Sequence, residues 1–227
     1  VFNAKEAIEL PAEVLQERIE KAFEYDDYKW ANENNIKTKC KKRAENIHKI
    51  LYKCPICKKE GTTNSKGIHI WCENCNNKWE LDEYYNIKCL TNENTFKLPS
   101  DWYRWEKEEV YKEVNEGTYH FEDDCRIEKL INSKVKFRHI GTVHMIHDNN
   151  GYKLKGTLDD GSDFELVKPP LSTRSMHIEY DYKGRGDALD FATQEKTWWV
   201  YPINPCCLTK FNFATEAIFE KNSKNIW

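Results

Sequence analysis

The most informative stretch of the sequence reads Cys54-Pro55-Ile56-Cys57, then fourteen residues, then Cys72-Glu73-Asn74-Cys75. In a Cys-x2-Cys turn both sulfurs can point at one ion, and two such turns supply the four tetrahedral ligands of a structural zinc site. Four thiolates leave no open position for water, so we expect the zinc ion to be structural. Two disulfides or four free thiols are the alternatives, and iron held by the same ligands is a further competitor.

The flanking residues favour a zinc ribbon over 52–97. Gly61 and Gly67 can bound a hairpin, and apolar residues alternate as they do in strands at Ile68, Ile70, Trp79 and Leu81. So short a module has almost no apolar core of its own. We therefore expect metal binding to supply most of its folding free energy, on the order of 10 kcal/mol.

Residues 1–51 are predicted to form a helical lead-in. One helix is expected from Pro11 to Asn34, because apolar residues recur at helical spacing at Val14, Leu15, Ile19, Ala22 and Phe23. A shorter helix is expected from Arg43 to Tyr52, with Ala44, Ile47 and Leu51 on one face.

A connecting helix is predicted within 98–132. Ser100 is suited to the N-cap, Asp101 to the positive end of the helix dipole, and Gly117 to the end of the helix. Its apolar side would carry Trp102, Trp105, Val110, Tyr111 and Val114. The charged residues Glu106, Lys107, Glu108, Lys112 and Glu113 are expected to face solvent.

From residue 133 to 227 the apolar period changes to two, which predicts strands divided by turns. The expected strands are Val135–His147, Tyr152–Leu158, Asp163–Val167, Met176–Tyr182, Ala188–Thr193 and Thr197–Tyr201. A helix should follow from Cys207 to Lys221. The fold class is therefore α+β: a helical lead-in, a four-cysteine zinc ribbon, a connecting helix, and an antiparallel β-barrel of the pleckstrin-homology or GRAM type with a C-terminal helix. An unrelated β-sandwich is the alternative to the barrel.

The composition of the 227 residues limits the class of protein. The net charge is −3, yet the segment 36–67 holds ten basic residues and only two acidic ones. No run approaches the ~18 apolar residues of a membrane helix. The chain begins at Val1 without a secretory leader pattern, which favours a reducing cytosolic compartment and a fragment of a larger protein. Outside the two Cys-x2-Cys turns, we expect Cys40, Cys89, Cys125, Cys206 and Cys207 to be packing residues.

No catalytic group stands out. His144 and His147 are three residues apart on a predicted strand, so they should face opposite sides and cannot share an ion. The acidic run 122–124 is expected to be solvated, and 184–187 to be a turn without the glycine spacing of a phosphate loop. Trp198 and Trp199 could be interfacial aromatics, but we expect one in the core and the other exposed.

Several segments together resemble the region downstream of the catalytic domain in a group of bacterial 1-acyl-sn-glycerol-3-phosphate acyltransferases. They read Glu24-Tyr25-Asp26-Asp27-Tyr28-Lys29-Trp30, Asn32-Glu33-Asn34, Arg43-Ala44-Glu45-Asn46-Ile47-His48-Lys49-Ile50-Leu51-Tyr52-Lys53-Cys54-Pro55-Ile56-Cys57, Asp101-Trp102-Tyr103-Arg104-Trp105-Glu106, Thr209-Lys210 and Glu216-Ala217. The resemblance covers most of the chain and is most specific around the ribbon. It implies that 1–51 is the end of an upstream acyltransferase domain.

The catalytic motif of that family is a His followed by four residues and an Asp, in which the His is the general base. None of the seven histidines has an Asp five positions later. No catalytic residue is therefore carried over, and the resemblance implies a non-catalytic accessory region of a phospholipid-biosynthesis enzyme.

The basic segment suggests an anionic partner. The candidate contact residues are Lys37, Lys39, Lys41, Lys42, Arg43, Lys58 and Lys59. The first interpretation is an anionic membrane lipid or an acidic acyl carrier, with the chain peripheral at the inner face of the membrane. The second is a nucleic acid or a protein, with His69 and Trp71 as exposed aromatics beside the lysines. A merely solvated face is the third.

Overall fold

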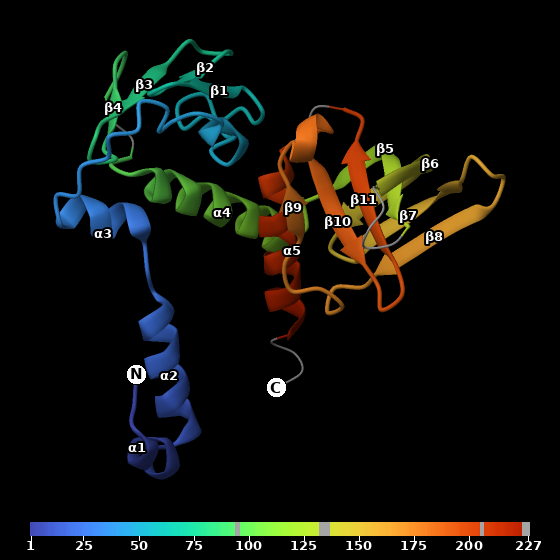
Figure 1. Ribbon diagram of the computed structural model, residues 1–227, viewed down its shortest axis with the longest axis horizontal. Helices are drawn as coiled ribbons and strands as arrows, with labels where there is room; N and C mark the ends of the chain where they lie inside the picture. Colours follow the sequence, from blue (N-terminus) through green and yellow to red (C-terminus); the bar gives the residue numbers. More distant parts are fainter. Residues whose placement is uncertain (94–95, 132–136, 205–206, 224–227) are drawn as a thin grey trace.

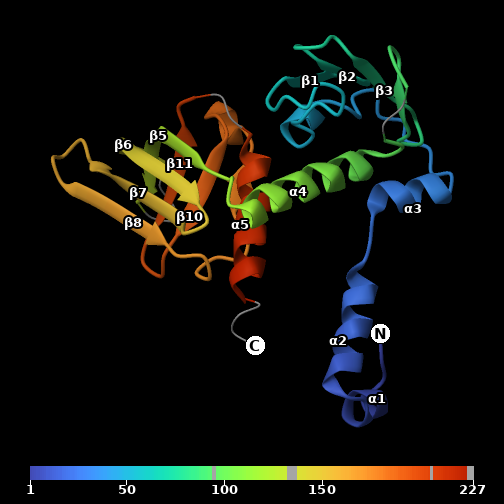
Figure 2. The same cartoon turned by 180° about the vertical axis from the view of Figure 1, so that it is seen from behind.

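The computed structural model describes residues 1–93, 96–131, 137–204 and 207–223. It is a mixed α+β structure with two separate antiparallel sheets. Figures 1 and 2 show a helical arm at the N-terminus, a small sheet above helix α4, and a larger sheet on the far side of helix α5.

The N-terminal arm consists of α1 (Ala4–Glu9), α2 (Ala12–Phe23) and α3 (Asp27–Glu33). The prediction of one helix from Pro11 to Asn34 is wrong, because Asp26 is extended and caps α3 by accepting the backbone N–H of Lys29. No residue of α1 or α2 is buried, and both helices project away from the rest of the chain (Figure 1).

The helix predicted from Arg43 to Tyr52 is also absent. The segment is a series of turns with one short 3-10 helix, η1 (Ile47–Lys49), and Asn46 before it has a left-handed φ of 63° that no α-helix contains. The expected apolar residues Ala44, Ile47 and Leu51 are nevertheless buried against the small sheet.

The small sheet has four antiparallel strands in sequence order: β1 (Thr63–Lys66), β2 (His69–Cys72), β3 (Lys78–Leu81) and β4 (Ile87–Cys89). Ile70 pairs with Trp79 across β2 and β3, and both side chains are fully buried. Trp102 of α4 completes this core, with its ring 5.1 Å from that of Trp79.

Helix α4 (Pro99–Glu116) joins the two sheets. Its N-cap is Leu98 instead of Ser100, because the carboxylate of Asp101 accepts the Leu98 N–H at 3.0 Å. It ends at Gly117 as predicted, where φ is 74°. The expectation that Glu106 faces solvent is wrong, since this side chain is fully buried.

The large sheet has the strand order β8-β7-β6-β5-β11-β10-β9. Its first strand in the sequence, β5 (Phe121–Leu130), follows the end of α4 at Gly117 and was not predicted, because no strand was expected before residue 133. The strands expected after residue 133 are all present with small shifts, and Val135 lies outside the described residues. They are β6 (Phe137–Asp148), β7 (Gly151–Thr157), β8 (Asp163–Lys168), β9 (His177–Glu179), β10 (Ala188–Ala192) and β11 (Thr197–Pro202), with a 3-10 turn, η2 (Tyr182–Gly184), after β9.

Helix α5 (Leu208–Ser223) covers one face of this sheet, where Leu208 and Phe211 enter its core. Both faces of β11 are covered: Trp198 belongs to that core, while Trp199 stacks on Phe137 at 3.9 Å on the other face. The expectation that one of the two tryptophans is exposed is therefore wrong.

Within the described ranges no pairing between β8 and β9 closes the sheet into a barrel. None of the described helices is long and apolar enough to cross a bilayer.

Candidate metal centre

The two Cys-x2-Cys turns have the same backbone geometry. Cys54 and Cys72 each accept, through the carbonyl oxygen, the N–H of the residue four positions later, at 2.9 Å in both turns. That residue is Lys58 in the first turn and Asn76 in the second, and both have a left-handed φ near 60°. The chain thereby reverses tightly enough for the second cysteine of each turn to lie beside the first.

These turns bring the four sulfurs together. All four Sγ atoms lie within 4.8 Å of one another, with 3.6 Å between Cys54 and Cys75 and 3.7 Å between Cys57 and Cys72. A tetrahedral ion with metal–sulfur bonds of about 2.3 Å requires sulfurs about 3.8 Å apart. A disulfide requires about 2.05 Å, and all four cysteines are free. The four-cysteine group thus fits one metal ion and no disulfide.

Neighbouring polar groups tune the thiols. Burial raises the pKa of Cys54. Burial would also raise that of Cys75, but hydrogen bonds from Asn77, whose Nδ2 donates to the sulfur at 3.0 Å, and from Cys72 and Cys54 lower it to about 6. Thr62 Oγ1 lies 3.3 Å from the sulfur of Cys72. Donors placed on sulfur in this way stabilise thiolates, the form that binds metal.

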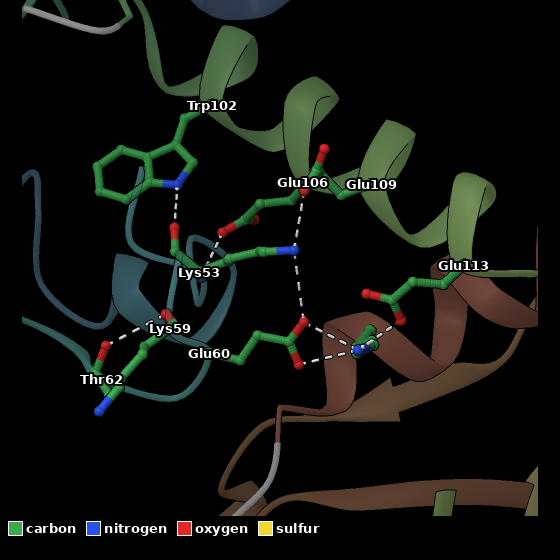
Figure 3. A network of polar contacts seen from close by, with 9 residues as sticks. Lys53, Lys59, Glu60, Thr62, Trp102, Glu106, Glu109 and Glu113 are labelled. Carbon is green, nitrogen blue, oxygen red and sulfur yellow. Dashed lines mark hydrogen bonds and ion pairs between the residues drawn. The ribbon is translucent and has the colours of Figure 1, made fainter. Parts of the chain in front are cut away.

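Side chains of helix α4 bind the backbone of Lys53, the residue before Cys54 (Figure 3). Glu106 Oε1 accepts the Lys53 N–H at 2.7 Å, and Trp102 Nε1 donates to the Lys53 carbonyl at 2.9 Å. Burial raises the pKa of the Glu106 carboxyl well above its ordinary value, although the hydrogen bond from the Lys53 N–H opposes this rise. The backbone N–H and the carbonyl of Lys53 are therefore both bound by side chains that lie one helical turn apart on α4.

A chain of ion pairs continues from Lys53 to α5 (Figure 3). Lys53 Nζ lies 3.1 Å from Glu109 and 3.8 Å from Glu60. Glu60 also accepts from Lys210 of α5 at 2.9 Å, and Lys210 reaches Glu113 of α4 at 2.8 Å. Burial opposes the charge of Lys210, but these two carboxylates raise its pKa. The metal ribbon, α4 and α5 thus share one polar junction.

The seven basic residues expected to contact an anion are divided by the structure. Lys37 pairs with Glu83 at 2.6 Å, Arg43 Nε donates to the Leu81 carbonyl, and Lys59 donates to Asn74. Lys58 lies over the ring of Trp105, 4.4 Å from its centroid. Lys39, Lys41 and Lys42 are exposed and make no ion pair with any described residue.

The structure also locates the remaining polar candidates. His144 and His147 face opposite sides of β6, as predicted: His147 is fully buried, while His144 is exposed and contacts Asp124 at 2.9 Å and Glu122 at 3.0 Å. Asp123, between them, is buried and accepts from Asn204, so the acidic run is not wholly solvated.

The other cysteines mostly pack as expected. Cys125 is buried in the sheet core, Cys89 is half-buried against the ribbon core, and Cys207 packs at the junction, where burial raises its pKa to about 12. The expectation is wrong for Cys40, which is exposed, and Cys206 lies outside the described residues.

Sequence reasoning missed Glu106, because it was expected to face solvent with the other charged residues of its helix, and it assigned no structural role to Lys210. The available signal for Glu106 was its position one turn after Trp102, on the side of the helix that carries this buried ring.

No protein-family model matches the chain, and no curated protein matches its sequence.

Proposed function

We propose that this chain is a zinc-stabilised, non-catalytic accessory region of a bacterial phospholipid-biosynthesis acyltransferase, docking its parent enzyme at an anionic membrane surface. The resemblance of the segments around the ribbon supports the family. The sulfur spacing supports a closed tetrahedral ion, for which zinc is the common choice with four thiolates. In this proposal the large sheet with α5 corresponds to the pleckstrin-homology or GRAM-like part, and an upstream acyltransferase domain supplies catalysis.

The observation that carries the membrane role is the group of unpaired lysines. Lys39, Lys41 and Lys42 lie close together in sequence just before the ribbon, and all three are exposed. Each basic residue near an anionic leaflet contributes about 1 kcal/mol, so three together favour reversible, peripheral attachment. The chain would then lie at the cytosolic face of the membrane, where an acidic acyl carrier could meet the same lysines.

Nucleic acid is the less favoured partner. Recognition of single strands by a zinc ribbon would use flat exposed aromatics beside the lysines. Trp71 is half-buried, and His69 lies 3.6 Å from the carboxylate of Glu80, which would repel a phosphate backbone.

Vesicle flotation of the zinc-loaded chain tests the membrane role. We expect binding to vesicles that contain phosphatidylglycerol, little binding to pure phosphatidylcholine, and loss of binding in the double variant Lys41→Glu, Lys42→Glu. The control is Lys153→Glu, Lys155→Glu, which makes the same charge change at exposed positions of β7. Equal flotation of both double variants, or a nucleic-acid gel shift without flotation, would contradict the proposal.

A further inference from the structure

The face of the large sheet opposite α5 carries an arginine within its central strands. Cys125 and Ile127 of β5 enter the core under α5, so Arg126 between them points to the other face. The register with β6 shifts between Ile127 and Glu128, and the Glu128 side chain binds Arg126. Arg126 is directly opposite Thr142 on β6 and Tyr201 on β11. Arg126 therefore lies between two paired strands, and side chains on paired strands are held more precisely than side chains on loops.

A second arginine joins it over a buried carboxylate. Glu128 is almost fully buried and binds both Arg126 and Arg185, the latter at 2.8 Å. Tyr201 donates its hydroxyl to Glu128 at 3.1 Å, and its ring lies 3.7 Å below the guanidinium of Arg126. Arg185 also donates to the Phe137 carbonyl at 3.2 Å. Both guanidinium groups are therefore fixed before any ligand arrives.

Arg126, Arg185 and Tyr201 line a depression of about 390 Å³. The side chains of Arg126 and Arg185 are 36% and 29% exposed in it, and Thr142 and His139 lie beside them. The single negative charge of Glu128 pairs with the two positive charges of Arg126 and Arg185, so the three side chains together carry one net positive charge. Asp187, also at the depression, is neutralised by Lys49 at 2.6 Å, and His139 lies 3.4 Å from Asp159.

We propose that this depression binds a phosphate monoester group. Each guanidinium has five N–H donors, and the contacts to Glu128 and to backbone carbonyls leave some of them for a ligand. The planar fork of arginine matches phosphate oxygens, and the Thr142 hydroxyl adds a neutral donor. The site lies on the large sheet and does not include Lys39, Lys41 or Lys42.

The rim of the depression favours a lipid headgroup as the source of the phosphate. Ile203 lines the depression and is 59% exposed, which places an apolar side chain beside a charged site, as is common where a protein meets the membrane interface. This choice of source rests on the proposed membrane role, whereas the site itself rests on the arginine pair alone.

The first test titrates the zinc-loaded chain with inorganic phosphate and follows the guanidinium Nε–H resonances of Arg126 and Arg185 by NMR. Thr142→Glu places a carboxylate beside Arg126 and removes no member of the Glu128 network, and we expect it to weaken binding at least about tenfold, or about 1.4 kcal/mol. Val167→Glu adds the same charge at an exposed position of edge strand β8 and should leave binding unchanged. Absence of saturable shifts, or equal loss in both variants, would overturn the site.

The second test separates the sources with vesicles of matched charge that contain phosphatidic acid or phosphatidylglycerol. A lipid source predicts stronger flotation with phosphatidic acid, weakened by Thr142→Glu and by Ile203→Ser, while Ile203→Ser still binds inorganic phosphate. Binding of inorganic phosphate without a preference for phosphatidic acid keeps the site and assigns it to free phosphate. The Lys41→Glu, Lys42→Glu variant should retain the NMR shifts, so failure of the membrane role and failure of this site remain distinguishable.

Discussion

At the scale of single residues, Glu106 has the most consequential environment among the described side chains. Its carboxylate is fully buried, one oxygen accepts the Lys53 N–H, and the other has no partner among the described residues. A buried carboxylate with an unsatisfied oxygen is costly when ionised. Glu106 therefore orders the peptide before the metal ligand at a cost in stability that grows with pH.

Replacing Glu106 should reveal this cost. Because burial raises its pKa in the folded state, the stability linked to protonated Glu106 is present below the unfolded value of about 4.3 and is lost as the pH rises through the folded value. Glu106→Gln keeps an acceptor for the Lys53 N–H and removes the ionisation. We expect its urea midpoint, relative to the native chain, to rise between pH 5 and pH 8.

Two further variants control this prediction. Glu108→Gln, on the exposed side of α4, should follow the pH dependence of the native chain. Glu106→Ala leaves the Lys53 N–H without a partner and should be destabilising by about 1–3 kcal/mol. Parallel pH curves for the native chain and Glu106→Gln would contradict the assignment of a raised pKa.

At the scale of elements, we expect the ribbon to depend on a metal ion held by its four cysteines. Strands β1 to β4 have three or four residues each, and the two fully buried cysteines, Cys54 and Cys72, are part of the small core. Removal of the ion leaves four thiols that repel one another if ionised and are poorly solvated if neutral. The small sheet does bury an apolar cluster that includes Ile70, Trp79 and Trp102, but two of the four thiols lie inside it, so we expect loss of the ion to disrupt that cluster.

Chelation should therefore unfold the ribbon selectively. Elemental analysis is expected to give one zinc per chain, and Cys72→Ser should lose it, whereas Cys40→Ser, which changes an exposed thiol outside the cluster, should keep it. Binding free energies on the order of 10 kcal/mol are typical of such sites. An unchanged thermal profile after chelation, or zinc retained by Cys72→Ser, would sink the assignment.

The elements also show what the sequence can predict. The sequence predicted features that depend on a few neighbouring residues: the Cys-x2-Cys turns, the end of α4 at Gly117 and the alternating strands. The left-handed Asn46 was missed because the apolar spacing of Ala44, Ile47 and Leu51 continues across it. The break at Asp26 was missed because the predicted helix was extended beyond Phe23, where its apolar spacing ends. Strand β5 was missed because it begins with an acidic run, in which Glu122 and Asp124 are exposed and contact His144 on β6.

Sites that depend on the register of paired strands cannot be predicted from patterns within one segment. Arg126 and Arg185 are 59 residues apart and meet only because β5 and β11 pair in a particular register and η2 returns the chain to that face. Glu60, Glu113 and Lys210 likewise come from three separate elements. No periodicity within one segment encodes these contacts, so the sequence alone predicted the metal centre but neither of these clusters.

At the scale of the whole molecule, the ribbon and the large sheet are joined through α4 and α5. Tyr52, two residues before the first ligand, packs in one apolar cluster with Val110 and Val114 of α4 and Phe213 of α5. Thr209 donates to the Lys49 carbonyl at 2.7 Å, and Lys210 binds Glu60 and Glu113. A structural change at the metal should therefore reach α5.

Hydrogen exchange on the zinc-loaded and the chelated chain can measure this coupling. After chelation we expect faster exchange first in the ribbon, then in α4 around Trp102 and Glu106, and then in the first turns of α5, since each is bound to the one before. Lys210→Met removes the cation between Glu60 and Glu113 while keeping most of the side-chain volume. In this variant chelation should still affect α4, but its effect on α5 should diminish, because the ionic contact to the ribbon is lost.

The matched control for this experiment is another lysine of α5. Lys221 donates to the Val114 carbonyl at 2.9 Å and so binds α5 to α4 without touching the ribbon. Lys221→Met should leave the response of the first turns of α5 to chelation unchanged. If α5 does not respond in the native chain, or if both variants respond alike, the polar junction does not transmit the state of the metal site.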